Sequence, residues 1–324
     1  MTSLHARAGS TRVSAGAGGS RDPPRGGTCE GLVFGAVSFV LVDGLRLHFQ
    51  QWGSSDPRAT IVLVHGLGSS SHIWDLVGPL LAAEAIRVLA IDQRGHGESD
   101  QPDHGYDFES IVADLSGFMQ LVEVPGPAVL VGHSWGASVV LHFAAAHPSR
   151  AAGIVLVDGG TSSPGERWSW EETETRLRPP DVDGLQWSDL HQRMSRNNGA
   201  YTDPRAEAVG RSLFRVDAEG RVTRRFRIPN HMQVVRALWE QRPAELLPRV
   251  ACPVLILPAR QASDPPEMKA NKIASVDRAL QLQPHARVRW FDDTVHDVPL
   301  QRPRELATEV SEFVRRIAPA RTPT

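Results

Sequence analysis

The chain places a serine between two glycines directly after a short apolar run. Residues 128–131 read Ala-Val-Leu-Val, residues 132–136 read Gly-His-Ser-Trp-Gly, and a helical run covers residues 138–144. A sharp turn from a strand into a helix holds such a serine with strained backbone angles, and the flanking glycines avoid a collision with the neighbouring chain. The N–H groups at the start of the helix favour negative charge beside the hydroxyl. The pattern therefore predicts a nucleophilic Ser134 on a strand-to-helix turn.

Strands and helices alternate on both sides of this motif. Continuous apolar runs, which are typical of parallel strands buried on both faces, cover residues 60–64, 87–91, 128–131 and 153–157. Between these runs, apolar residues recur at helical spacing in residues 73–83 and 108–122. The alternation predicts an α/β fold with a mainly parallel sheet flanked by helices.

Composition and periodicity divide the chain into four parts. Residues 1–35 are rich in Gly, Ser and Arg and poor in large apolar side chains, so we expect a disordered tail. Residues 36–160 hold the first part of the core and open with a hairpin at Asp43-Gly44. The alternation stops in residues 161–247, which hold four tryptophans and many arginines and are interpreted as an inserted, mostly helical cap with a small hairpin. The core resumes in residues 248–324, with strands at residues 252–257 and 287–291 and helices at residues 268–283 and 303–317.

The candidate functional residues fall at the carboxyl ends of the strands, where open α/β sheets bind their ligands. Ser134 ends one strand, His65 ends an earlier one, and His296 follows the last strand by a short loop. A serine hydroxyl is a poor nucleophile at neutral pH and needs a base within hydrogen-bond reach. Because the order of nucleophile and then histidine fits this architecture, we predict that His296 is the base.

An oxyanion formed at the serine would need two main-chain donors. We predict the N–H groups of Trp135, the residue after the serine, and of Leu67, in the glycine-rich loop after His65. Two further histidines are interpreted as structural: His96 packs within the turn of residues 92–99, and His133 is expected to hydrogen-bond locally.

These motifs together resemble the α/β-hydrolase superfamily over residues 38–318. The motifs follow the order of that superfamily and lie at residues 65–68, 92–99, 132–136 and 296–303. The resemblance implies an enzyme fold shared by esterases, lipases, thioesterases, lactonases, peptidases and carbon–carbon hydrolases. Serine at position 134 is unlike haloalkane dehalogenases and epoxide hydrolases, which use aspartate at the nucleophile position.

Two aspartates compete for the role of the acid that orients His296. Many members of the superfamily carry this acid in a Gly-x-x-Asp turn after the strand that here ends at Leu257, but this chain has alanine at both key positions and Asp264 comes two residues late. Asp158 ends the strand at residues 153–157, a position from which some branches take their acid. We favour Asp158 because its strand fixes it more firmly, with Asp264 as the alternative.

The leading hypothesis is a cofactor-free serine hydrolase that cleaves a carboxylic ester or related small acyl compound through an acyl-enzyme. In this hypothesis Ser134 attacks, His296 transfers the proton, and Asp158 or Asp264 orients the histidine. The aromatic cap residues would line an apolar acyl pocket, although ordinary packing explains any one of them equally well. Two alternatives stay open: hydrolysis of a carbon–carbon bond by the same residues, and a ligand-binding sensor or inactive partner that keeps the fold.

The composition of the chain argues against several other classes of protein. The formal net charge of −2 gives no reason to expect a nucleic-acid partner. The two cysteines, Cys29 and Cys252, cannot form a disulfide framework or a Cys-rich metal site, and they favour a reducing, cytoplasmic location. No apolar stretch reaches the roughly 18 residues of a membrane span, and no cluster of His, Asp and Glu has the spacing of metal ligands. The oligomeric state is left open.

Overall fold

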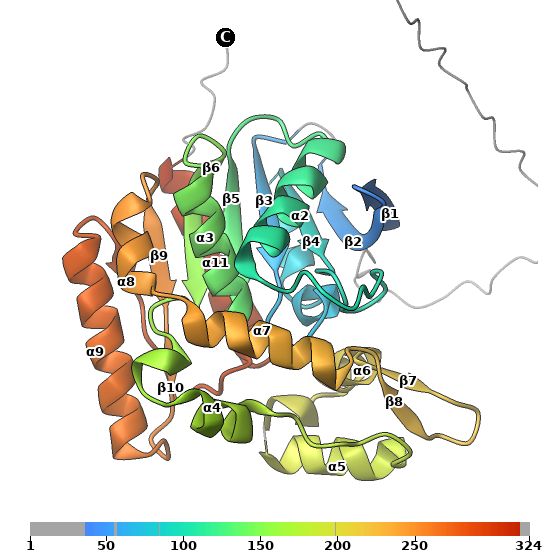
Figure 1. The fold of residues 1–324 in the computed structure, drawn as a ribbon. Helices are drawn as coiled ribbons and strands as arrows, with labels where there is room; N and C mark the ends of the chain where they lie inside the picture. The colour runs from blue at the N-terminus through green and yellow to red at the C-terminus, as the bar shows by residue number, and fades with distance from the viewer. Residues whose placement is uncertain (1–35, 55–56, 84, 198, 318–324) are drawn as a thin grey trace, which may run out of the picture. The chain divides into compact units, whose positions relative to one another are not determined.

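A mainly parallel sheet lies at the centre of the described residues (Figure 1). The computed structural model describes residues 36–317 except 55–56, 84 and 198, so the predicted tail at residues 1–35 and Cys29 lie outside the described residues. In the described part of the chain the sheet has eight strands: β1 (Ala36–Val42), β2 (Leu45–Gly53), β3 (Ala59–Val64), β4 (Ile86–Ile91), β5 (Ala128–His133), β6 (Ala151–Val157), β9 (Val254–Leu257) and β11 (Arg287–Val288).

The strand order is β1-β2-β4-β3-β5-β6-β9-β11. β1 pairs antiparallel with β2, β2 pairs antiparallel with β4, and the remaining pairs are parallel. The predicted α/β class with a mainly parallel sheet is confirmed. β3, β5 and β6 lie next to one another, so their carboxyl ends meet at one edge of the sheet.

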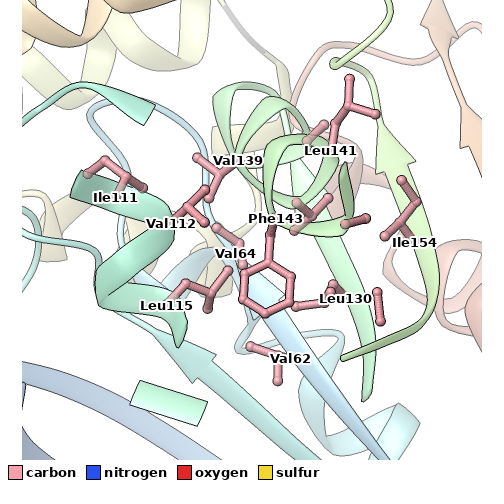
Figure 2. Close-up of a cluster of buried hydrophobic side chains, with 14 of the residues drawn as sticks. Val62, Val64, Ile111, Val112, Leu115, Leu130, Val139, Leu141, Phe143 and Ile154 are labelled. Carbon is pink, nitrogen blue, oxygen red and sulfur yellow. The ribbon is translucent and has the colours of Figure 1, made fainter. Parts of the chain in front are cut away.

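Helices cover both faces of the sheet because alternate strand residues point to opposite sides. On one face Val62, Val64 and Leu130 pack against α2 and α3, as Figure 2 shows. On the other face Ile61 and Leu63 pack in a second cluster with α1 and α11. The helices of the core are α1 (Gly78–Ala82), α2 (Phe108–Leu121), α3 (Trp135–Ala146), α9 (Pro266–Leu282), α10 (Val298–Gln301) and α11 (Pro303–Ile317), with the 3-10 turn η1 (Ser71–Trp74). The short helix α8 (Pro243–Leu246) and the 3-10 turn η4 (Leu247–Arg249) lie where residues 161–247 rejoin the core.

Two elements that the sequence analysis predicts as continuous are each divided in the structure. The predicted helix at residues 73–83 is instead η1 followed by α1, because Pro79 lacks an N–H and is tolerated only in the first turn of a helix. The predicted last strand at residues 287–291 is instead β11 and a separate β12 (Phe291–Asp292), which pairs with β10 (Ala259–Arg260). Pro258 separates β9 from β10, since it offers no N–H to a ladder.

Residues 161–247, here called the inserted segment, connect β6 to the second part of the core. Figure 1 places its helices at the end of the sheet toward which the arrowhead of β6 points. The predicted hairpin is present as β7 and β8. The elements of this segment are η2 (Pro164–Glu166), α4 (Trp170–Leu177), α5 (Trp187–Asn197), η3 (Gly199–Thr202), α6 (Pro204–Ser212), β7 (Phe214–Val216), β8 (Val222–Arg224) and α7 (Ile228–Glu240).

Candidate active site

Ser134 sits on the turn between β5 and α3 with a strained backbone (φ 56, ψ −118). Non-glycine residues seldom adopt a positive φ, so the surrounding packing must hold this conformation. A Cβ at Gly132 would overlap the carbonyl oxygen of Gly136, and a Cβ at Gly136 would overlap that of Val64. The Ser134 N–H donates to the carbonyl of Val157 in β6 at 2.9 Å. The two glycines therefore let β5, α3 and β3 close tightly around the serine.

The loop after β12 brings His296 to Ser134, although the two residues are 162 positions apart in the chain. The Nε2 of His296 lies 2.8 Å from the Ser134 Oγ, and its Nδ1 lies 2.6 Å from Oδ2 of Asp158. In the neutral ring, Nδ1–H donates to the carboxylate while Nε2 accepts the serine hydroxyl proton. This is the geometry in which a histidine removes a proton from a serine.

Asp158 follows β6 directly and is almost fully buried, with 3% of its side chain exposed. Its Oδ1 accepts hydrogen bonds from the Ala259 N–H at 2.9 Å and from the Lys272 Nζ at 2.8 Å. Burial raises the pKa of this carboxyl, but the hydrogen bonds and charges of His296 and Lys272 outweigh burial and hold the pKa well below its usual range. Asp158 is therefore ionised at neutral pH.

The alternative acid, Asp264, does not contact His296. Its Oδ2 accepts the Gln261 N–H at 2.8 Å within the loop before α9. Both ring nitrogens of His296 are already engaged, one by Asp158 and one by Ser134. Of the two candidate aspartates, the structure brings only Asp158 to the histidine.

The pKa of His296 is raised above its ordinary value of 6.5. Partial removal of the ring from water lowers the pKa, but the hydrogen bond and charge of Asp158 and the charge of Asp297 raise it by more. Lys272 opposes this rise through its own positive charge. About half of the His296 side chain, 52%, is exposed, so the ring can be reached from solvent.

The two predicted oxyanion donors lie on the two segments that flank the serine. Trp135 is the first residue of α3, and Leu67 follows Gly66, where a Cβ would lie 3.0 Å from the Cβ of Ser134. Within the described residues, no protein acceptor takes the main-chain N–H of Leu67 or of Trp135. Both donors are therefore available to a negatively charged oxygen beside Ser134.

His96 fixes the loop that carries Leu67. The Gly68 N–H donates to His96 Nε2 at 3.2 Å, and His96 Nδ1–H donates to the carbonyl of Arg94 at 2.9 Å. This arrangement needs a neutral ring, and burial lowers the pKa of His96 well below its ordinary value. The sequence analysis predicts only a packing role for His96 and misses this contact.

His133 and Lys272 are the other residues that sequence reasoning missed. His133 does not bond locally as expected: its Nε2–H donates to the carbonyl of His296 at 2.9 Å, across 163 residues of sequence. Lys272 comes from the middle of α9 and reaches Asp158 across 114 residues. No motif spacing relates residues so far apart, so the sequence contains no signal for either contact.

Three of the four tryptophans in the inserted segment, Trp168, Trp170 and Trp239, pack on one another and on arginines. The rings of Trp170 and Trp239 meet edge to face, Arg236 lies over both, and the indole N–H of Trp239 donates to the carbonyl of Trp168. These contacts are the ordinary packing that the sequence analysis weighs against an acyl-pocket lining.

The described residues hold neither a cluster of metal-binding side chains nor a membrane-spanning helix. Among those residues, no three His, Cys, Asp or Glu side chains gather where they could hold a metal ion. In the same part of the chain, no helix has both the length and the apolar character needed to cross a bilayer.

The fold and the site define an α/β protein with serine, histidine and aspartate side chains hydrogen-bonded in series at the carboxyl edge of its sheet. The family model described as "Alpha/beta hydrolase family" matches residues 61–309. The chain belongs to the alpha/beta hydrolase family.

Curated relatives carry several different activities. Lipase LipV of Mycobacterium tuberculosis is 28% identical over 273 residues, which cover 82% of this chain and 97% of the lipase. A non-heme chloroperoxidase of Streptomyces lividans is 37% identical over 116 residues, 36% of this chain and 41% of that protein. Epoxide hydrolase B of Mycobacterium tuberculosis is 37% identical over 115 residues, 35% of this chain and 32% of that protein. The last two matches therefore span less than half of those relatives.

Solved structures agree with the fold. An E-2-(acetamidomethylene)succinate hydrolase superposes with a TM-score of 0.72 at 22% identity and covers 87% of this chain and 99% of its own. The enol-lactonase from Burkholderia xenovorans LB400 gives a TM-score of 0.63 at 19% identity, with 86% and 99% coverage. At these identities the likeness establishes the fold alone.

Proposed function

We propose that this protein is a cofactor-free serine hydrolase that cleaves a carboxylic ester or related small acyl compound. The observation that carries the proposal is the unbroken series of hydrogen bonds from Ser134 Oγ through His296 to Asp158, at 2.8 and 2.6 Å. The similarity to a named lipase over nearly its whole length supports an ester as substrate.

In the first half of the proposed reaction, His296 Nε2 takes the proton of Ser134 as Oγ forms a bond to the acyl carbon. The N–H groups of Leu67 and Trp135 stabilise the negative charge on the carbonyl oxygen. The bond to the leaving alcohol then breaks, and His296 returns its proton to that alcohol. The product of this half is an acyl ester on Ser134.

In the second half, His296 takes a proton from water, whose oxygen attacks the acyl carbon. Collapse of the second tetrahedral intermediate breaks the bond to Ser134 Oγ, which regains the proton from His296. Asp158 stays ionised throughout, keeps the ring in the tautomer with Nδ1–H, and stabilises the positive charge that forms on it twice in each cycle.

The test uses p-nitrophenyl esters of graded chain length and a fluorophosphonate probe. We expect hydrolysis of short-to-medium esters and labelling at Ser134, with kcat lowered by at least about 10⁴-fold in Ser134→Ala. Asp158→Asn should lower kcat by about 10²- to 10⁴-fold, whereas Asp264→Asn should resemble the native protein. Equal activity in Ser134→Ala would refute the serine mechanism. Absence of labelling would favour the sensor hypothesis, and turnover confined to diketones would favour carbon–carbon hydrolysis.

A further inference from the structure

The carboxylate of Asp158 has a second cationic partner on the side away from the histidine. Lys272 Nζ lies 2.8 Å from Oδ1 of Asp158 and 2.7 Å from the carbonyl oxygen of Ala259. The N–H of Ala259 donates to the same Oδ1 at 2.9 Å, while Oδ2 accepts from His296. Each carboxylate oxygen therefore has its own set of donors, which fixes the rotation of the carboxylate relative to the imidazole.

The contact between Lys272 and Asp158 is an ion pair as well as a packing contact. A carboxylate with only 3% of its side chain exposed requires a counter-charge, and His296 supplies one only while its ring is protonated. Among the described residues that hydrogen-bond to Asp158, Lys272 is the one with a permanent positive charge. Its ammonium group is anchored at the same time by the Ala259 carbonyl, so the ion pair has a defined geometry.

A cavity of about 370 Å³ opens beside this ion pair. Its wall includes Asp158, Lys272, Asn271, Glu166 and Arg278, whereas Ser134 and His296 do not line it. Lys272 keeps 24% of its side chain exposed. Small ions can therefore reach the back of the carboxylate without passing the serine.

We propose that Lys272 is a positioning residue of the active site, which orients the carboxylate of Asp158 and balances its charge so that His296 keeps the correct tautomer and basicity. The proposal rests on the hydrolase function proposed above. The loop around Ala259 contributes through its main chain, which clamps both the carboxylate and the ammonium group.

Several charged groups face this system from neighbouring elements. Asp297 raises the pKa of His296, Lys272 lowers it, and His133 lies with its ring centroid 4.9 Å from that of His296. Arg278, which also lines the cavity, pairs with Glu166 at 2.8 Å. Of the cations on α9 that line this cavity, Lys272 contacts Asp158 directly and Arg278 does not.

The decisive variant is Lys272→Met, which removes the charge and keeps much of the chain length. Without the ammonium group, the negative charge of Asp158 acts on His296 unopposed. We expect the acid limb of kcat/KM against pH to move upward by about half to one pH unit, and kcat/KM at neutral pH to fall about 10- to 100-fold. An unchanged midpoint would overturn the proposal, because a merely structural lysine would alter stability without moving the limb.

Arg278→Met is the matched control. It removes a positive charge from the same helix and the same cavity wall but leaves Asp158 untouched, so its pH profile should match that of the native protein. If Lys272→Met does not fold, Lys272→Gln decides the question, since it removes the charge and keeps a hydrogen-bond donor on a side chain one bond shorter. A shift of equal size in Arg278→Met would also overturn the proposal, since any nearby charge would then suffice.

Chemical rescue gives a second readout. In Lys272→Ala, propylammonium chloride can enter the cavity, and we expect it to restore kcat/KM and the native midpoint, whereas sodium chloride at equal ionic strength does not. Equal effects of the two salts would count against Lys272. Fluorophosphonate labelling of the native protein distinguishes failure of the hydrolase function from failure of the role of Lys272. A native protein that shows neither labelling nor turnover refutes the hydrolase function. If the native enzyme is labelled and Lys272→Met keeps the native midpoint of the acid limb, only the role of Lys272 is refuted.

Discussion

At the scale of single residues, the proposed mechanism makes the protonation of His296 set the pH range in which Ser134 reacts. In that mechanism the ring must be neutral to accept the serine proton, and the hydrogen bond and charge of Asp158 raise the pKa of His296 above 6.5. Below that pKa the ring is protonated and the serine stays a hydroxyl, so kcat/KM should rise with pH through a midpoint above 6.5. Initial rates on one p-nitrophenyl ester across the pH range would locate this midpoint.

The control for this prediction is Asp158→Asn. The remaining effect of partial burial then lowers the pKa of His296, so the midpoint of the residual activity should fall. His133 does not cause the rise of kcat/KM with pH, because burial and the nearby His296 lower the pKa of His133 to about 4. A native midpoint below 6.5, or an upward move in Asp158→Asn, would contradict the assignment of the limb to the pair of His296 and Asp158.

At the scale of elements, the turn between β5 and α3 depends on close approach of three backbones. In Gly136→Ala the new Cβ would overlap the carbonyl oxygens of Val64 and His65, which cannot move without shifting β3. We expect a loss of about 2–4 kcal/mol in the free energy of unfolding, measured by urea denaturation. Gly199→Ala is the control, since a Cβ at Gly199 meets open space and should change stability by less than about 1 kcal/mol. Equal urea midpoints for Gly136→Ala and Gly199→Ala would contradict this prediction. They would show that β3 can shift to accommodate the new Cβ at little cost in stability.

Some elements around the site can be predicted from the sequence, whereas contacts between distant elements cannot. The strands around Ser134 are predictable because burial on both faces leaves continuous apolar runs, and Ser134 is predictable because its turn demands glycines at fixed positions. The division of the predicted helix at residues 73–83 follows from local chemistry at Pro79 that periodicity alone does not reveal. The contact from Lys272 to Asp158 was not predictable, because it depends on where α9 lies in space.

At the scale of the whole molecule, the inserted segment shares the core of the sheet domain. Phe226 is 3% exposed and stacks on His96 with ring centroids 3.7 Å apart, and it belongs to the same buried cluster as Val62 and Leu130. The Asn230 amide donates to the Tyr106 hydroxyl at 2.9 Å. All described residues fall within one compact unit. Unfolding of the inserted segment alone would therefore expose part of the main core.

This shared core predicts cooperative unfolding. Phe226→Ala should lower the free energy of unfolding by about 3–5 kcal/mol, because it leaves a cavity beneath His96 as well as removing a buried ring. Leu41→Ala, at a side chain exposed on β1, should change it by less than about 0.5 kcal/mol. Far-UV circular dichroism and tryptophan fluorescence, which reports on four tryptophans of the inserted segment among eight in the chain, should give coincident urea transitions in both variants. A separate early fluorescence transition in Phe226→Ala would mean that the inserted segment unfolds independently of the sheet core and would contradict the prediction.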